Sequence, residues 1–187
     1  MANVDSAFGL RPVRHSGGGT IRTSEYRIAS TYGTSIFTGD PVLTSGTGKE
    51  INIGGAGGNI VGVFAGCEYQ TAAGVFFSKY WPLSTILLAG TVCKAYVYDD
   101  PSIVFAVQVA TDGTGITAAM IGDKADLASG TGSTQTGLSA WELTAPGTDA
   151  QVRILELNAD PGNAYGEHAV VNVLIAEHEL AGNLTEV

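Results

Sequence analysis

The sequence predicts an all-β fold, built as a small β-barrel followed by a second β-rich lobe and preceded by an extended N-terminal arm. Glycine and proline supply 26 and 6 of the 187 residues, enough to interrupt helices and to provide many turns. Hydrophobic residues make up 44% of the chain, a share too high for a disordered protein. Short apolar runs recur between turn signals, and this spacing favours strands over helices.

The arm is predicted over residues 1–24, which combine arginine, glycine, serine and proline with few apolar side chains. Residues 1–27 hold four arginines against two acidic residues, a local charge of +2, so the other 160 residues carry the remaining −11 of the net charge of −9. An acidic body of this kind repels phosphate. We therefore expect no nucleic-acid partner.

The barrel is predicted over residues 25–110, where three apolar runs at 60–69, 92–98 and 103–109 are the clearest strand candidates. An acidic turn, Asp-Asp-Pro-Ser at 99–102, separates the last two runs. Turn residues of these types favour a tight connection between neighbouring strands. The sequence thus predicts that the second and third runs form a hairpin.

Both cysteines fall on the apolar face of a predicted strand. Cys93, Ala95 and Val97 lie on one face by the period of two that is typical of a half-buried strand. The first run alternates in the same way, with Val61, Val63, Ala65 and Cys67 on one face. Cys67 and Cys93 are therefore expected to be small, buried and reduced core residues.

The second lobe is predicted over residues 111–187. Its strand candidates lie at 141–143, 152–157 and 169–176, and a Gly/Ser/Thr-rich loop occupies 129–137. The only helical signal is a single weak turn around 122–127. With the barrel, this gives ten to thirteen short strands, a number typical of small barrels and related all-β architectures.

The sequence offers no catalytic constellation, so we expect a protein that is not an enzyme. Its three histidines are His15 in the predicted arm, His168 at the start of a predicted strand and His178 at the end of that strand. His178 lies between two glutamates, but adjacent strand residues point to opposite faces and do not converge on one metal ion. None of the HExxH, Gly-x-Ser-x-Gly and Asp-Thr-Gly motifs of hydrolases is present.

We also expect no cofactor and no metal. The glycine-rich stretches at 16–19 and 54–58 do not lead into helices, as phosphate-binding loops do. The acidic turns lack the residue spacing of a calcium-binding loop. The two cysteines form no CxxC pair, which argues against a zinc site or a disulfide framework and suits a reducing interior.

The sequence indicates neither secretion nor membrane insertion. The first residues lack a basic region followed by an apolar one, so no secretory signal is expected. The longest apolar stretch, at 86–89, is too short to span a bilayer. We therefore expect a protein that is made in the cytoplasm of its host and has no membrane partner.

Several short segments of the sequence resemble those of a known family. The segments are AFGLRPVRH at 7–15, TGDPV at 38–42, GVFAGCEY at 62–69, FSKYWP at 77–82 and AYVYDDP at 95–101, with shorter ones at 130–134 and 161–164. They resemble small head proteins of tailed bacteriophages, and by that resemblance the chain looks like a capsid decoration, or cement, protein. The match runs along most of the chain.

The resemblance implies a structural virion protein that binds the outer surface of the major capsid protein shell and stabilises the phage head. It implies two partners: the major capsid protein and copies of the chain itself, as a dimer or trimer. The implied location is the outer surface of the capsid. A low charge and many short strands suit a protein that is soluble before assembly and then covers a preformed shell.

The arm is the predicted point of attachment, because a segment that becomes ordered on a neighbour makes a long contact from few residues. Phe8, Leu10 and Val13 are its candidate apolar anchors. Arg11 and Arg14 are candidate fork-shaped donors to carboxylates on the shell.

Two alternatives remain at the level of the sequence. A phage tail or baseplate module would share the glycine-rich, β-rich composition. A carbohydrate-binding protein would instead use exposed aromatic rings as stacking platforms beside acidic loops, with Tyr69, Tyr96, Tyr98 and Trp141 as candidates.

Overall fold

The computed structural model describes residues 3–46, 48–111, 115–147 and 150–181. Over these residues the chain is all-β, as predicted, with fourteen strands in antiparallel sheets. The one helical element described is a short 3-10 turn, η1 (Ala118–Met120). No helix in the described ranges has the length and apolar character needed to cross a membrane.

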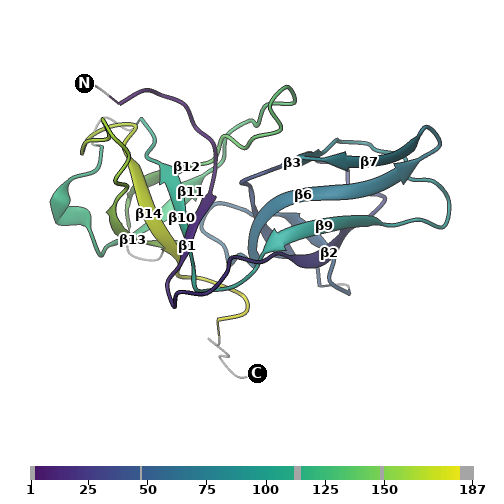
Figure 1. Cartoon of the computed structure of the whole chain (residues 1–187), viewed down its shortest axis with the longest axis horizontal. Helices are drawn as coiled ribbons and strands as arrows, with labels where there is room; N and C mark the ends of the chain where they lie inside the picture. Colours follow the sequence, from purple (N-terminus) through teal and green to yellow (C-terminus); the bar gives the residue numbers. More distant parts are fainter. Residues whose placement is uncertain (1–2, 47, 112–114, 148–149, 182–187) are drawn as a thin grey trace.

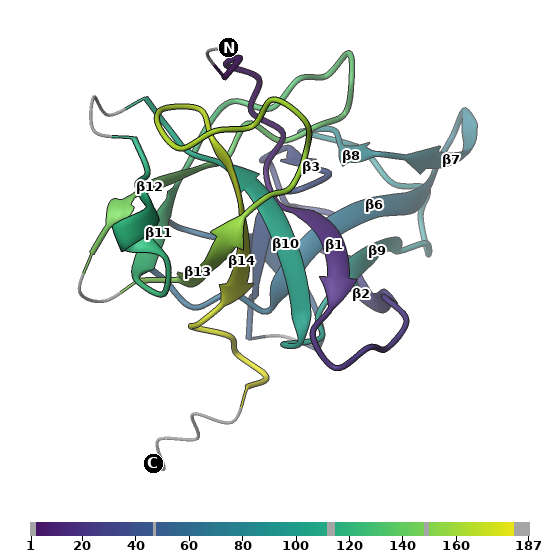
Figure 2. The ribbon, with the colours of Figure 1, turned by 60° about the vertical axis from the view of Figure 1, so that its left-hand side comes forward.

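Six strands form the first large sheet, sheet I, in the order β1-β10-β14-β13-β11-β12 (Figure 1). They are β1 (Arg11–His15), β10 (Ile103–Gln108), β11 (Lys124–Ala128), β12 (Glu142–Pro146), β13 (Val152–Leu157) and β14 (Val170–Ile175). Figure 2 shows β1 lying beside β10 at the edge of this sheet.

The second large sheet, sheet II, has the order β2-β9-β6-β4-β5, with β7 added to β6. Its strands are β2 (Ser24–Ile28), β4 (Pro41–Thr44), β5 (Ile51–Ile53), β6 (Gly62–Thr71), β7 (Gly74–Ser78) and β9 (Cys93–Tyr98). A small third sheet pairs β3 (Ile36–Phe37) with β8 (Tyr80–Trp81). The two large sheets lie at opposite ends of the long axis in Figure 1.

Each large sheet curls back toward itself and is bridged at a single point. A parallel bridge joins Val109, just after β10, to Leu143 of β12. A second one joins Arg27 of β2 to Glu50, just before β5. Within the described residues no continuous ladder joins the edge strands of either sheet, so the barrel predicted for residues 25–110 takes the form of a curled sheet.

The hairpin predicted at 92–109 is wrong. Both runs form strands, but β9 pairs with β2 and β6 in sheet II, whereas β10 pairs with β1 and β14 in sheet I. All six residues of β10 are buried, which requires cover on both faces and suits the interior of a sheet. The chain therefore crosses between the lobes at the 99–102 turn, and residues 103–110 belong to the sheet of the second lobe.

The prediction of an N-terminal arm outside the core is wrong for residues 10–15. Residues 11–15 form β1, which pairs with β10 along the edge of sheet I. Leu10 is 1% exposed and belongs to the core of this lobe, and its backbone N–H donates to the carbonyl of Gly39 at 2.9 Å. Its side chain packs among the other buried apolar residues of this core although its neighbours in the sequence are mostly polar.

The helical turn predicted around 122–127 is also wrong. Residues 124–128 form β11, with Ala125 and Leu127 buried in the alternating pattern of a half-buried strand. The turn of helix lies a few residues earlier, at η1. The burial of alternate residues stabilises a strand in this segment, and this outweighs the weak helical signal of its sequence.

Each lobe has its own hydrophobic core, and β6 contributes to both. Val63 packs in the core of sheet I, whereas Phe64 and Cys67 pack in the core of sheet II. A bulge between Phe64 and Gly66 inserts one residue into β6, which places Phe64 and Cys67 on the same face. The single shared face predicted for Val61, Val63, Ala65 and Cys67 is therefore wrong at Val63.

The two cysteines are buried and unpaired, which confirms their predicted burial. In β9, Cys93 alternates with partly exposed neighbours as the sequence predicted. The hydrogen bond to Cys67, followed by burial, raises the pKa of the Cys93 thiol far above its ordinary value. A thiol held in this form is a poor nucleophile.

Candidate functional site

The predicted attachment residues lie along β1 and the residues just before it, but they differ in exposure. Leu10 is buried and has no surface to offer another protein, which corrects its assignment as an anchor. Phe8 is half-buried beneath Arg11, whose guanidinium carbon lies 4.8 Å from the ring centroid. Val13 is exposed at the bulge of β1.

Both candidate arginines have carboxylate partners within the same lobe. Arg14 Nη2 lies 2.9 Å from Glu156 Oε1, and Arg11 Nη2 lies 3.8 Å from Asp160 Oδ2. The hydrogen bond from Arg14 lowers the pKa of the Glu156 carboxyl. The charge of β1 is thus balanced by acidic residues of sheet I and its loops.

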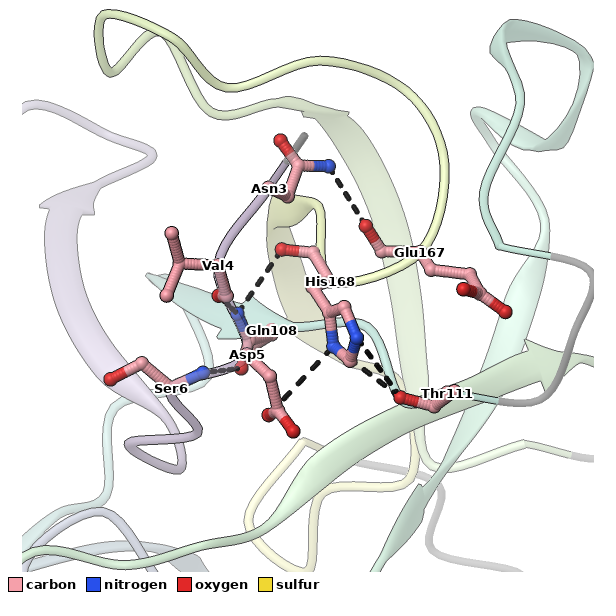
Figure 3. A network of polar contacts seen from close by, with 8 residues as sticks. All are labelled: Asn3, Val4, Asp5, Ser6, Gln108, Thr111, Glu167 and His168. Atoms are coloured by element: carbon pink, nitrogen blue, oxygen red, sulfur yellow. Dashed lines mark hydrogen bonds and ion pairs between the residues drawn. The ribbon is translucent and has the colours of Figure 1, made fainter. Parts of the chain in front are cut away.

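The N-terminal segment, residues 3–6, is fastened to sheet I by a buried glutamine. Ser6 N donates to Gln108 Oε1 at 2.9 Å, and Gln108 Nε2 donates to Val4 O at 2.8 Å (Figure 3). The same Nε2 donates to His168 O at 3.1 Å. One side chain of β10 therefore holds both the N-terminal segment and the residue that precedes β14.

Asn3 adds a second fastening. Its Nδ2 donates to Glu167 O at 2.9 Å (Figure 3). The same Nδ2 donates to Ala164 O at 2.8 Å, and Asn3 Oδ1 accepts from Ala164 N at 3.1 Å. These bonds satisfy the amide on both sides. The segment is consequently positioned along a defined path on the body.

These fastenings bring together Asp5, Glu142 and His168. One potential ligand atom of each lies within 4.8 Å of the others. Burial and the negative charge of Asp5 raise the pKa of the Glu142 carboxyl, and His168 partly offsets this. Sequence reasoning missed the cluster because its members come from three distant segments with no motif spacing.

Exposed apolar side chains gather at the far end of sheet II. Seven of the twelve large hydrophobic residues that are exposed in the described chain fall within residues 75–92, so they mark one region. We call this region the apolar tip: Val75, Phe76, Phe77, Leu83, Ile86, Leu88 and Val92. It comprises β7, on the right-hand side in Figure 1, and the segment between β8 and β9, whose first exposed residue, Leu83, lies beside Ser35 near the third sheet.

The tip is anchored to the core of sheet II. Phe76 stacks on Tyr69 of β6 with ring centroids 5.5 Å apart, and Tyr69 meets Trp81 edge-on at 5.5 Å. Leu88 N donates to the carbonyl of Gln70 at 2.8 Å, which ties the second segment to β6. These contacts hold the exposed side chains on a rigid base.

β7 is the outer strand of this region. It pairs with β6 alone, from Cys67↔Ser78 to Thr71↔Gly74, and no described strand pairs with its other side. Phe77, on the face opposite Phe76, is 78% exposed. An open strand edge presents unpaired N–H and C=O groups to another chain.

A cleft of about 420 Å³ lies beside the third sheet, lined in part by Ser35, Phe37 and Asp40. Asp40 is buried, and its carboxylate accepts a hydrogen bond from Phe37 N at 2.7 Å. Burial raises the pKa of Asp40 to about 6. Among the described lining residues there is no histidine, cysteine or lysine to complete a nucleophilic site beside this carboxyl.

Each of the four aromatic residues considered as a carbohydrate platform is buried or contacts other residues of the protein. Trp141 is buried in the core of sheet I. Tyr69 is stacked as described above, and Tyr96 donates its hydroxyl to Glu68 at 3.3 Å. Tyr98 is half-buried and packs against the core of sheet I. This geometry disfavours the carbohydrate-binding alternative.

No protein-family model, no curated protein and no solved structure matches this chain.

Proposed function

We propose that the protein is a capsid decoration, or cement, protein of a tailed bacteriophage, which binds the outer surface of the major capsid protein shell and stabilises the head. The observation that carries the proposal is the apolar tip. Seven of the large exposed apolar residues of the described chain fall within this one segment, and a concentration of exposed apolar side chains is typical of a protein-binding region. The sequence segments that resemble phage head proteins indicate the class of the partner, a capsid protein.

The edge of β7 suits attachment to a shell built from another protein. A strand or extended segment of the capsid protein can add to this edge through backbone hydrogen bonds, while Phe77 and Val75 enter apolar pockets beside it. The stack beneath Phe76 holds the edge in place, so little conformational freedom is lost on binding.

The proposal moves the point of attachment from the N-terminal segment to sheet II. Arg11 and Arg14 already have carboxylate partners, and Leu10 is buried. Attachment through Phe8, Arg11, Val13 and Arg14 stays a prediction, and the same experiment tests it.

The experiment compares phage particles that carry single variants of the chain. Phe77→Ser removes the most exposed aromatic ring of the tip, and Leu180→Ser, at a residue 54% exposed outside it, is the matched control. Because a central apolar anchor contributes about 2 kcal/mol or more, occupancy at limiting protein should fall by at least about tenfold for Phe77→Ser. Leu180→Ser should bind like the wild type.

Other outcomes separate the alternatives. Heads that carry Phe77→Ser at full occupancy and keep their heat resistance would contradict the proposed surface. A loss confined to the double variant Arg11→Ala, Arg14→Ala would return attachment to the N-terminal segment. Protein found on tails and absent from heads would favour the tail or baseplate module.

A further inference from the structure

Three potential metal ligands converge at one side of the sheet I lobe. Asp5 comes from the N-terminal segment, Glu142 begins β12, and His168 lies just before β14. Asp5 Oδ1 is 3.8 Å from His168 Nδ1, and the closest Glu142 oxygen lies within 4.8 Å of both. A tetrahedral ion with bonds of about 2.0–2.1 Å holds its ligands roughly 3.3 Å apart. Rotation of Asp5, whose side chain is 70% exposed, closes this difference.

The charges of the cluster are unbalanced. Among the described residues, neither Asp5 nor Glu142 forms an ion pair with a lysine or arginine, and His168 is the basic side chain beside them. Two carboxylates therefore share one imidazole. A divalent cation between them would balance both negative charges and leave the imidazole neutral, the form that coordinates metals.

The imidazole is oriented by a neighbour outside the carboxylate pair. His168 Nε2 lies 3.1 Å from Thr111 Oγ1. Nδ1 lies 3.5 Å from the same hydroxyl oxygen and 3.8 Å from Asp5 Oδ1. When Nε2–H donates to this hydroxyl, Nδ1 is the unprotonated ring nitrogen, the form that coordinates a metal. Metal-binding histidines commonly donate their second ring N–H to a fixed acceptor, which sets the tautomer and the ring orientation.

The backbone of two of the three residues is held by the same buried side chain. Gln108 donates to His168 O and contacts Val4 and Ser6, the residues on either side of Asp5 (Figure 3). The distance between the Asp5 and His168 backbones is thereby fixed without any contribution from their side chains. Such support is what a preformed ligand site requires.

We propose that Asp5, Glu142 and His168 bind one divalent transition-metal cation of the zinc type, which fastens the N-terminal segment to sheet I. An imidazole together with two carboxylates suits zinc, whereas calcium and magnesium favour sites made of oxygen alone. The two cysteines are buried, so they do not compete for zinc in the folded protein. This site is independent of the proposed attachment through the apolar tip.

The test is calorimetric titration of the untagged, full-length, chelator-stripped protein with zinc chloride. We expect one zinc ion per chain and no binding heat with calcium or magnesium chloride. His168→Ala and Glu142→Gln should each weaken zinc binding at least tenfold. His15→Ala is the matched control, because His15 pairs with a single carboxylate, Asp100, at 3.0 Å, and it should leave zinc affinity unchanged.

If the histidine variant fails to fold, Asp5→Asn still tests the site. The Asp5 side chain is exposed and asparagine has nearly the same volume, so this variant is expected to fold. It too should weaken binding at least tenfold, and amide exchange at Ser6 should slow on zinc addition only in the wild type. Absence of zinc binding by the wild type would overturn the site. Unchanged affinity in Asp5→Asn and Glu142→Gln would overturn it as well.

Discussion

The two sheets differ most clearly in their edge strands, β1 and β7. The edge of sheet I carries the sequence Arg-Pro-Val-Arg-His, with a proline, two arginines and a bulge. These are the devices by which proteins prevent an edge from pairing with another chain. In sheet II, the added strand β7, which pairs with β6 alone, carries Gly-Val-Phe-Phe-Ser, which has no charge and no proline.

The difference teaches where this protein can meet a partner. β1 pairs with β10, and its arginines form ion pairs with carboxylates of their own lobe. The charged groups of this edge of sheet I are therefore already paired, and we call it the closed edge. β7 leaves apolar side chains and backbone groups open beside a firmly anchored core. The lobe whose sequence composition suggested an attachment arm is thus the closed one.

The largest expected effect concerns Leu10, which fixes β1 to the body. Leu10→Ala should lower the free energy of unfolding by about 2–5 kcal/mol, because a fully buried leucine leaves a cavity. Urea unfolding followed by circular dichroism measures the change. A loss under about 0.5 kcal/mol, typical of a surface residue, would restore the arm interpretation.

Asp40 gives a pH-dependent effect where the two lobes meet. Its pKa is raised by burial from an ordinary value of 3.8 to about 6, so the folded protein binds this proton more tightly than the unfolded chain does. Stability from this group is therefore full below about pH 4 and falls by about 3 kcal/mol as the pH rises through 6. Asp40→Asn should flatten this part of the stability profile, and a parallel profile in the variant would contradict the assignment.

A smaller effect is expected at the closed edge. Arg14→Ala should lower the free energy of unfolding by only about 0.2–1 kcal/mol, since its ion pair with Glu156 is half-exposed to solvent. Added salt should reduce the difference between variant and wild type. A loss well above this range would mean that β1 depends on its charges more than on Leu10.

The smallest stability effect is expected at the open edge. Phe77→Arg gives β7 the kind of charge that β1 carries, and it should change the free energy of unfolding by less than about 0.5 kcal/mol. It should also raise the concentration at which the free protein begins to self-associate, as measured by light scattering. Lowered solubility in this variant would argue against an exposed apolar edge.

Sequence reasoning reached furthest where one face of a strand is buried. The alternation in β9 located Cys93 on the inner face. It failed for β10, because a run buried on both faces carries no signal of which strands lie beside it. It also failed at β6, where the bulge at Phe64 reverses the alternation.

The candidate sites were harder to predict for a related reason. The tertiary fold brings together Asp5, Glu142 and His168, which lie in three distant segments, so no local sequence motif predicts the cluster. The exposure of Phe77 depends on β7 having one partner strand, which composition does not reveal. The polar neighbours of Leu10 predict a surface anchor, whereas the side chain packs in the core of sheet I.

The most direct test of the central proposal is a cryo-electron microscopy map of the phage particle that contains this protein. The proposal predicts density for the chain at many symmetry-related positions on the outside of the head. In that density the β7 end should meet the capsid protein, and residues 3–15 should lie on the chain's own sheet I. A head without this density, or a chain attached through an extended N-terminal segment while β7 faces solvent, would contradict it.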